Sequence, residues 1–196
     1  MVLPELAGID YRPGWLPPDE ADALFTGLRD TVPWQVHRIR MRGREIASPR
    51  LSCWMGDEGA AYAYSGARFE PHPWPALLSP LRLRLEAECR GAFNGVLANL
   101  YRDGRDAMGW HRDDEPELGD APLIASLSLG GTRRFLLKDA RGDRHAVALA
   151  GGDLLLMSGD SQRLYRHALP RTARPVAPRI NLTFRRVAAS GRPWGQ

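Results

Sequence analysis

The chain has 196 residues and a mass of 21.8 kDa, with 43% hydrophobic and 26% charged residues, which fits one globular domain over residues 1–196. No apolar run approaches the roughly 20 residues that cross a bilayer, and Cys53 and Cys89 suit neither a thiolate zinc site nor a disulfide scaffold, so we expect a cytoplasmic protein without a membrane partner. The formal net charge of +4 rests almost wholly on arginine, because Lys138 is the only lysine, and it weakly favours a polyanionic partner such as nucleic acid.

Two helices are expected in the first half of the chain. The first follows Pro17, and its apolar residues recur at helical spacing: Leu24, Phe25 and Leu28. The second begins between Pro75 and Pro80, where one apolar stripe contains Leu77, Leu78, Leu81, Leu85 and Cys89. Both patterns are typical of helices that pack against a sheet.

The segment between these helices carries an alternating arginine row and two aligned tyrosines. The arginines occupy every second position: Arg38, Arg40, Arg42 and Arg44. A strand would present them all on one face, either to phosphates or as a solvated edge protected by charge. Tyr62 and Tyr64 would likewise share a strand face, and ordinary strand aromatics are the alternative to a binding role.

After Gly91 the pattern changes to short strands separated by turns rich in Gly and Asp. The expected strands cover residues 96–101, 123–129, 134–138, 145–149, 153–157 and 180–187. Several short strands close together predict a sandwich or jelly roll. Within 123–129, Ser126 and Ser128 face away from Leu127, so one face of this strand would enter the core and the other would line a cavity.

Three residues in this second half could hold a metal ion. His111 and Asp113 are two positions apart, so on an extended segment their side chains point the same way, and His167 lies between two later expected strands. Two histidines and one carboxylate bind one face of ferrous iron and leave the other positions open. The His-x-Asp pair alone is a weak signal.

The last expected strand alternates polar and apolar residues. Its polar residues are Arg179, Asn181, Thr183 and Arg185, and its apolar residues are Ile180, Leu182 and Phe184. Arginines in a cavity need anions, and Asp113 together with a dicarboxylate would supply them. Asn99 and Tyr101 share a face of an earlier strand and could hydrogen-bond the same acid. A strand facing solvent is the alternative.

Two longer stretches surround these residues. One runs from Asn99 through Gly-Trp-His111-Arg-Asp113-Asp114-Glu115 to Ser-Leu-Gly130, and the other joins His167-x-Leu-Pro to Pro-Arg179-Ile-Asn-Leu-Thr-Phe-Arg185. Together they resemble the AlkB family of 2-oxoglutarate- and iron-dependent dioxygenases, over roughly residues 35–187, and the combination is far more specific than the His-x-Asp pair. The resemblance implies an α+β fold, a double-stranded β-helix (jelly roll) with flanking helices and an N-terminal nucleotide-recognition lid.

The resemblance also implies roles around the cofactors Fe(II), 2-oxoglutarate and dioxygen. His111, Asp113 and His167 would ligate the metal. Arg179 would pair with the distal carboxylate of 2-oxoglutarate. The residues around it would complete the cofactor site: Tyr101, Asn181 and Thr183 beside Arg179, and Asn99 and Arg185 near the iron. Arg185 would also act beside Asp113 in catalysis.

Substrate binding would fall mainly to the lid, residues 35–66. In the family a finger residue beside a glycine fills the gap left by a flipped base, and here that finger is Met41-Arg42-Gly43. Relatives carry an aromatic residue in place of Arg42, which argues against intercalation into a duplex. Residues expected to contact the extruded base are Trp54, Tyr62, Tyr64, Asp114 and Glu115, with Tyr64 stacking on it. Residues 188–196 are expected to form a flexible tail.

The expected function is oxidative dealkylation of nucleic-acid bases such as 1-methyladenine and 3-methylcytosine, with 2-oxoglutarate converted to succinate and CO2 and release of formaldehyde. The partner would be alkylated DNA, or RNA, and the protein a monomer. Two alternatives remain. One is an oxygenase of the same chemistry acting on a protein or small molecule, and the other is a non-catalytic nucleic-acid-binding module.

Overall fold

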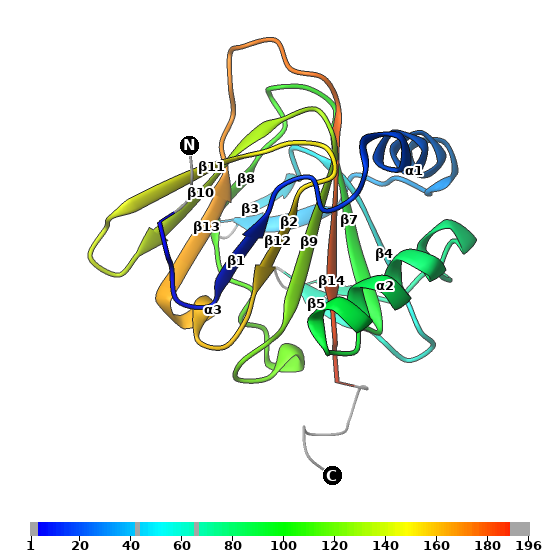
Figure 1. Cartoon of the computed structure of the whole chain (residues 1–196), viewed down its shortest axis with the longest axis horizontal. Coiled ribbons are helices and arrows are strands. Elements are labelled where there is room, and N and C mark those ends of the chain that lie inside the picture. Colours follow the sequence, from blue (N-terminus) through cyan, green and yellow to red (C-terminus); the bar gives the residue numbers. More distant parts are fainter. Residues whose placement is uncertain (1–3, 42–43, 65–66, 189–196) are drawn as a thin grey trace.

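The computed structural model describes residues 4–41, 44–64 and 67–188 (Figure 1). Over this part of the chain, two facing antiparallel sheets form the body of the molecule. The larger sheet has the order β1 (Ile9–Arg12), β12 (Leu154–Met157), β9 (Ile124–Gly130), β14 (Arg179–Arg185), β7 (Gly95–Tyr101), β4 (Leu51–Gly56). The smaller has the order β11 (Arg144–Leu149), β10 (Arg133–Asp139), β13 (Tyr165–Leu169), β8 (Met108–His111). This pair of sheets is the arrangement expected of a jelly roll.

Two further hairpins lie beside the sheets. One joins β2 (Arg38–Met41) to β3 (Arg44–Ala47), and the other joins β5 (Tyr62–Tyr64) to β6 (Ala67–Phe69). Because Met41 pairs with Arg44, the four arginines of the predicted row do not share one strand. The prediction of a single arginine face was therefore wrong, since the chain reverses direction within it.

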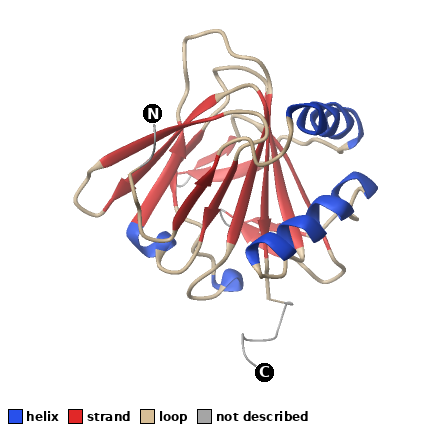
Figure 2. Cartoon of the chain, viewed as in Figure 1, coloured by secondary structure: helices blue, strands red, loops and turns tan. Residues whose placement is uncertain are grey.

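Helices cover the outer face of the six-stranded sheet (Figure 2). α1 (Pro18–Thr31) and α2 (Ser79–Cys89) pack there, whereas α3 (Ser161–Leu164) and the short 3-10 turns η1 (Ala76–Leu78) and η2 (Pro116–Leu118) lie in connections. α1 starts with proline at its first position, where no intrahelical donor is needed. Within the described residues, no helix is both long and apolar enough to cross a membrane.

One residue of the predicted apolar stripe on the second helix does not belong to it. Leu78, Leu81 and Leu85 are buried, but Leu77 is 44% exposed. The 3-10 turn η1 precedes α2, and its three residues per turn break the α-helical spacing that the stripe assumed. The rest of the helix packs on the sheet as predicted.

The main core lies between the six-stranded sheet and the helices. Alternation along β14 places Ile180, Leu182 and Phe184 in this core, each fully buried, together with Leu127 of β9. The polar residues of β14 therefore face the space between the two sheets, as the sequence predicted.

Two strands of the smaller sheet were not predicted. β8 and β13 are short, and β13 pairs with both β10 and β8. His167 therefore lies on a strand and not between strands, which corrects the sequence-based expectation. His167 lies between the charged Arg166 and the apolar Ala168, so polar and apolar residues do not alternate here as they would in a recognisable strand.

Candidate metal centre

The two histidines meet because their strands pair. His111 at the end of β8 is the direct partner of His167 on β13, and Asp113 follows two residues later. The ligand atoms of the three residues all lie within 4.8 Å of one another, with His111 Nε2 3.8 Å from Asp113 Oδ1. Two imidazoles and one carboxylate this close could bind one face of a metal ion.

Burial keeps both histidines in the form that binds metals. Burial and the neighbouring His111 lower the pKa of His167 to about 3, and burial also lowers the pKa of His111. His111 Nδ1 lies 2.9 Å from the carbonyl oxygen of Gly109, a bond that requires the proton on Nδ1 and so makes Nε2 the nitrogen whose lone pair could bind a metal. Both rings are therefore neutral donors at physiological pH.

Asp113 is held ionised by Arg185. Burial alone would raise the pKa of Asp113, but Arg185, through its charge and its hydrogen bond, together with the neighbouring His167 and His111 offsets burial and holds that pKa well below its usual range. Arg185 Nη2 donates to Asp113 Oδ2 over 2.8 Å, and both side chains are buried. Oδ1 has no hydrogen-bond partner in the described structure. A buried, unpaired carboxylate oxygen facing two imidazoles fits a cation.

Arg179 is a second buried arginine on the same face of β14. The Arg179 side chain is fully buried, and burial lowers its pKa to about 10. Its Nη2 donates to Ser128 Oγ over 2.8 Å, whereas Nε and Nη1 have no partner among the described residues. Tyr101 lies beneath the guanidinium, 5.4 Å from its carbon to the ring centroid. Two free donors on a buried guanidinium match a carboxylate, which would accept from both.

One cavity joins the metal cluster to Tyr101, the ring that lies against the Arg179 guanidinium, although Arg179 itself is not among the lining residues. Its walls contain most of the residues predicted for the cofactor site: Asn99, Tyr101, His111, Asp113, His167, Asn181, Thr183 and Arg185. Two of the predicted amides are already engaged, since Asn99 Oδ1 accepts from Arg50 Nε over 2.7 Å and Asn181 Nδ2 donates to Ser126 Oγ over 2.9 Å. The predicted hydroxyls of Tyr101 and Thr183 also face this cavity.

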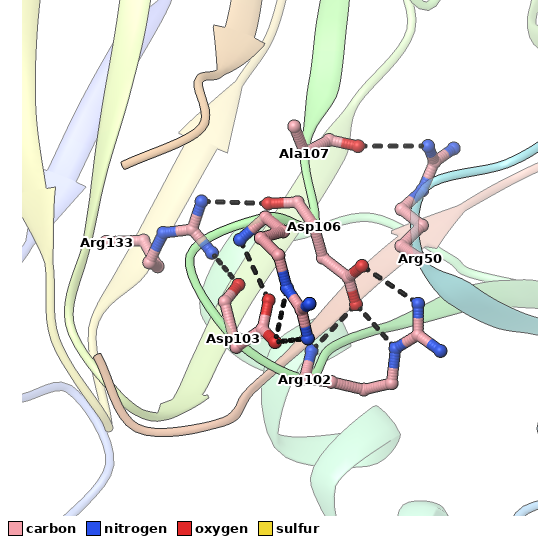
Figure 3. A network of polar contacts seen from close by, with 7 residues as sticks. Arg50, Arg102, Asp103, Asp106, Ala107 and Arg133 are labelled. Carbon is pink, nitrogen blue, oxygen red and sulfur yellow. Dashed lines mark hydrogen bonds and ion pairs between the residues drawn. The ribbon is translucent and has the colours of Figure 1, made fainter. Parts of the chain in front are cut away.

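A buried arginine that the sequence did not single out fixes the loop between β7 and β8. Figure 3 shows Arg133 reaching the carbonyl oxygens of Asp103 and Asp106, at 3.1 and 2.9 Å, beside the ion pair of Arg102 with Asp106. Arg133 also donates to the carbonyl oxygen of Pro170, at 2.8 Å. β7 ends at Tyr101 and β8 leads to His111. By fixing the loop between them, Arg133 holds the predicted 2-oxoglutarate residue Tyr101 and the predicted metal ligand His111 in place relative to each other.

Gln162 is a second residue that the sequence gave no reason to choose. It lies on α3, is 4% exposed, and its Oε1 accepts the backbone N–H of Asp113 over 3.0 Å. Its Nε2 faces Met157 Sδ and Ser161 Oγ, each at 3.4 Å. The bond fixes the backbone from which the Asp113 carboxylate projects. No local sequence motif predicts the contact between Gln162 and Asp113, because the two residues are far apart in the sequence.

The residues expected to contact substrate differ in their exposure to solvent. Trp54 is 2% exposed, stacks on Tyr62 at 4.8 Å between ring centroids, and donates to the carbonyl oxygen of Ala60. Tyr62 is fully buried beside Glu115, whose pKa burial and the Asp113 charge raise to about 7. Asp114 is exposed. Tyr62 and Glu115 thus lie beside the metal centre, with Trp54 packed behind them.

The remaining lid residues lie at the ends of the two hairpins. Arg42 and Gly43 of the predicted finger lie outside the described residues. Met41 ends β2, and Tyr64 ends β5 with its backbone paired to Ala67. Their roles in base binding stay predictions, as does the flexible tail, of which residues 189–196 are not described.

A family profile described as the 2OG-Fe(II) oxygenase superfamily matches residues 8–185. The human protein "Alpha-ketoglutarate-dependent dioxygenase alkB homolog 3" is 38% identical over 195 residues, which cover 93% of this chain and 68% of the human protein. The mouse protein "DNA oxidative demethylase ALKBH2" is 38% identical over 180 residues, which cover 86% of this chain and 75% of the mouse protein.

The chain spans about two thirds of the length of the alkB homolog 3 relatives, from 62% of the rat protein to 68% of the human one. Among solved structures, one described as "The structure of OsALKBH1" superposes with a TM-score of 0.66 at 20% identity, covering 94% of this chain and 100% of that one. At this identity the likeness shows the fold alone.

Proposed function

The chain belongs to the AlkB branch of the 2OG-Fe(II) oxygenase superfamily, and from this premise we propose that it removes alkyl groups oxidatively from nucleic-acid bases. The family membership confirms the resemblance expected from the sequence, the double-stranded β-helix, and the dependence on Fe(II), 2-oxoglutarate and dioxygen. One observation carries the proposal: a two-histidine, one-carboxylate cluster lines a cavity together with Tyr101, and the guanidinium of the buried Arg179, two of whose donors have no partner among the described residues, lies against that ring.

His111, Asp113 and His167 would hold the iron, and Arg179 would hold the far carboxylate of 2-oxoglutarate. The bound iron and 2-oxoglutarate supply the oxidising chemistry, in which dioxygen is consumed, succinate and CO2 form, and hydroxylation of an N-methyl group leads to loss of formaldehyde. Arg185 keeps the Asp113 carboxylate ionised and oriented through their 2.8 Å bond. Because the three ligands occupy one face, the opposite positions stay open for the co-substrates.

The walls of the site would position the modified base and exclude water. Tyr62 and Glu115 lie next to Asp113, so their polar atoms could meet the exocyclic amine of a base such as 1-methyladenine or 3-methylcytosine. The names of the relatives, which include a DNA oxidative demethylase, support a nucleic-acid substrate. Tyr64 stacking, a monomeric state and a cytoplasmic location stay predictions from the sequence.

Formaldehyde release from methylated oligonucleotides tests the proposal. With iron and 2-oxoglutarate, the protein should release formaldehyde from 1-methyladenine or 3-methylcytosine in DNA or RNA. If 2-oxoglutarate is turned over but no oligonucleotide yields formaldehyde, the substrate is a protein or small molecule. If anaerobic Fe(II) and 2-oxoglutarate give no charge-transfer absorption band, the fold serves only for binding. The same lesion in single and double strands identifies the preferred form.

A further inference from the structure

The outer face of the four-stranded sheet is a surface that the metal centre does not use. Figure 2 shows the long helices against the other sheet and none over this face. Neighbouring residues of a strand point to opposite sides, so where His167 and Leu137 face the interior, Arg166 and Lys138 face outward. The described helices therefore leave this face open to a partner.

Four cations line up across this face, and we call them the basic row: Arg144, Lys138, Arg166 and Arg112. Lys138 on β10 pairs directly with Arg144 on β11 and with Arg166 on β13, and Arg112 follows His111 on the neighbouring β8. None of the four forms an ion pair with an acidic residue that the structure describes. Like charges on adjacent strands repel, so an anionic partner would relieve the repulsion.

An indole ring holds two members of the basic row in place. Trp110 projects from β8 on the same side, with Lys138 Nζ 4.8 Å and the Arg144 guanidinium carbon 5.9 Å from its ring centroid. Cation–π contacts restrict these long side chains before a ligand arrives, which lowers the entropy lost on binding.

We propose that the basic row binds the sugar-phosphate backbone of the nucleic acid whose modified base occupies the metal centre. This inference rests on the proposed function. Adjacent strands are about 4.8 Å apart, so four cations span about 14 Å, enough to meet successive phosphates. β8 is an edge strand with His111 inside and Trp110 outside. A single strand of nucleic acid that leaves the cavity would reach the basic row by crossing the outer edge of β8.

The opposite side of the molecule has the opposite charge. α1 carries Asp19, Glu20, Asp22 and Asp30 against a single basic residue, Arg29. A nucleic acid is therefore attracted to the sheet side and repelled from the helix side. This difference in charge between the two sides favours binding of a polyanion to the outer face of the four-stranded sheet.

A matched pair of double variants tests the basic row. Lys138→Gln/Arg166→Gln removes two of its charges, and Arg29→Gln/Arg84→Gln removes two charges from the helices. Affinity for a long single-stranded methylated oligonucleotide is measured by fluorescence anisotropy over a range of salt concentrations. The slope of log affinity against log salt should become shallower by roughly 1.4 in the first variant, about 0.7 for each lost phosphate contact, and stay unchanged in the second.

Turnover separates this inference from the proposed function. A methylated trinucleotide is too short to leave the cavity and cross β8, so it should release formaldehyde equally well with all three proteins. Formaldehyde release together with equal salt slopes in both double variants would overturn the basic row and leave dealkylation standing. A shallower slope in the first variant without formaldehyde release by any protein would retain the basic row and reject dealkylation.

Discussion

Asp113 and Arg185 form the pair of opposite charges on which the metal centre depends. Each is buried, and Asp113 presents one oxygen to Arg185 and the other to the two histidines. The sequence predicted this contact from the alternation in residues 179–185, because two arginines on an inward face require anions. It could not predict Gln162 or Arg133, whose partners are backbone groups brought close only by the tertiary fold.

Replacing Arg179 by lysine should weaken 2-oxoglutarate binding without unfolding the protein. Lysine keeps the charge but loses the planar pair of donors that a carboxylate accepts, so the dissociation constant should rise roughly 10- to 150-fold, about 1.5–3 kcal/mol. Calorimetric titration of the metal-loaded protein with 2-oxoglutarate, without oxygen, measures the change. Arg134→Lys on the exposed face is the control, and an unchanged affinity for Arg179→Lys would assign the carboxylate to another residue.

Replacing Gln162 by methionine should weaken metal binding although Gln162 is no ligand. The variant loses the acceptor for the Asp113 N–H, and loss of such a supporting bond lowers metal affinity roughly 10- to 100-fold. Titration with Co(II), followed by its visible absorption, gives the affinity directly. Ser161→Ala, one position earlier on α3, keeps the bond and should bind Co(II) as the wild type does. Equal affinities for wild type and Gln162→Met would reduce Gln162 to a packing role.

The metal-free protein should lose stability as the pH falls from about 6.5 toward 3. His167 has a folded-state pKa of about 3 against the ordinary histidine value of 6.5, so between these values the unfolded chain binds a proton that the folded chain does not bind, and the free energy of unfolding rises with pH. Urea unfolding at several pH values measures this slope. His167→Gln should flatten the slope relative to the wild type, and an unchanged slope in that variant would contradict the assignment.

β14 and β7 show which elements a sequence can predict. Strict alternation over seven residues made β14 evident, β7 was expected from the short-strand pattern after Gly91, and the pairing of Arg179 with Tyr101 brings the predicted cofactor residues together. β8 and β13 were missed because four or five residues with few aliphatic side chains carry little periodic signal. Met41 and Tyr64 end strands of hairpins whose position depends on contacts with the rest of the fold.

Gly95, where β7 begins, should tolerate no side chain. A Cβ there would lie 2.3 Å from Trp54 Cζ2, so the ring that supports Tyr62 would have to move. Gly95→Ala should destabilise the protein by about 1–3 kcal/mol, measured by urea unfolding. Gly109→Ala, where a Cβ would meet nothing within 4 Å, should have little effect. Similar losses in the two variants would show that the close contact with Trp54 is not the cause.

In the molecule as a whole, the core, the metal centre and the basic row lie in different layers. Helices and apolar side chains stabilise the outer face of one sheet, the metal centre occupies the space between the sheets, and the basic row faces outward from the other sheet. The sequence predicted a jelly roll with flanking helices because strand alternation and helical stripes are local patterns. It could not show that the cations of β11, β10 and β13 align with Arg112 just after β8, because their register is decided by pairing between distant segments.

β14 is central in its sheet yet is the last strand along the described chain. During translation its neighbours β7 and β9 emerge first, and their facing edges have no partner until residues 179–185 leave the ribosome. Such edges invite pairing with other chains, so a chaperone that shields them should raise the yield of folded protein. Since Arg179 and Arg185 arrive with that final strand, a nascent chain lacks both the arginine proposed to anchor 2-oxoglutarate and the counter-ion of Asp113, so it cannot assemble the metal centre before its last strand is made.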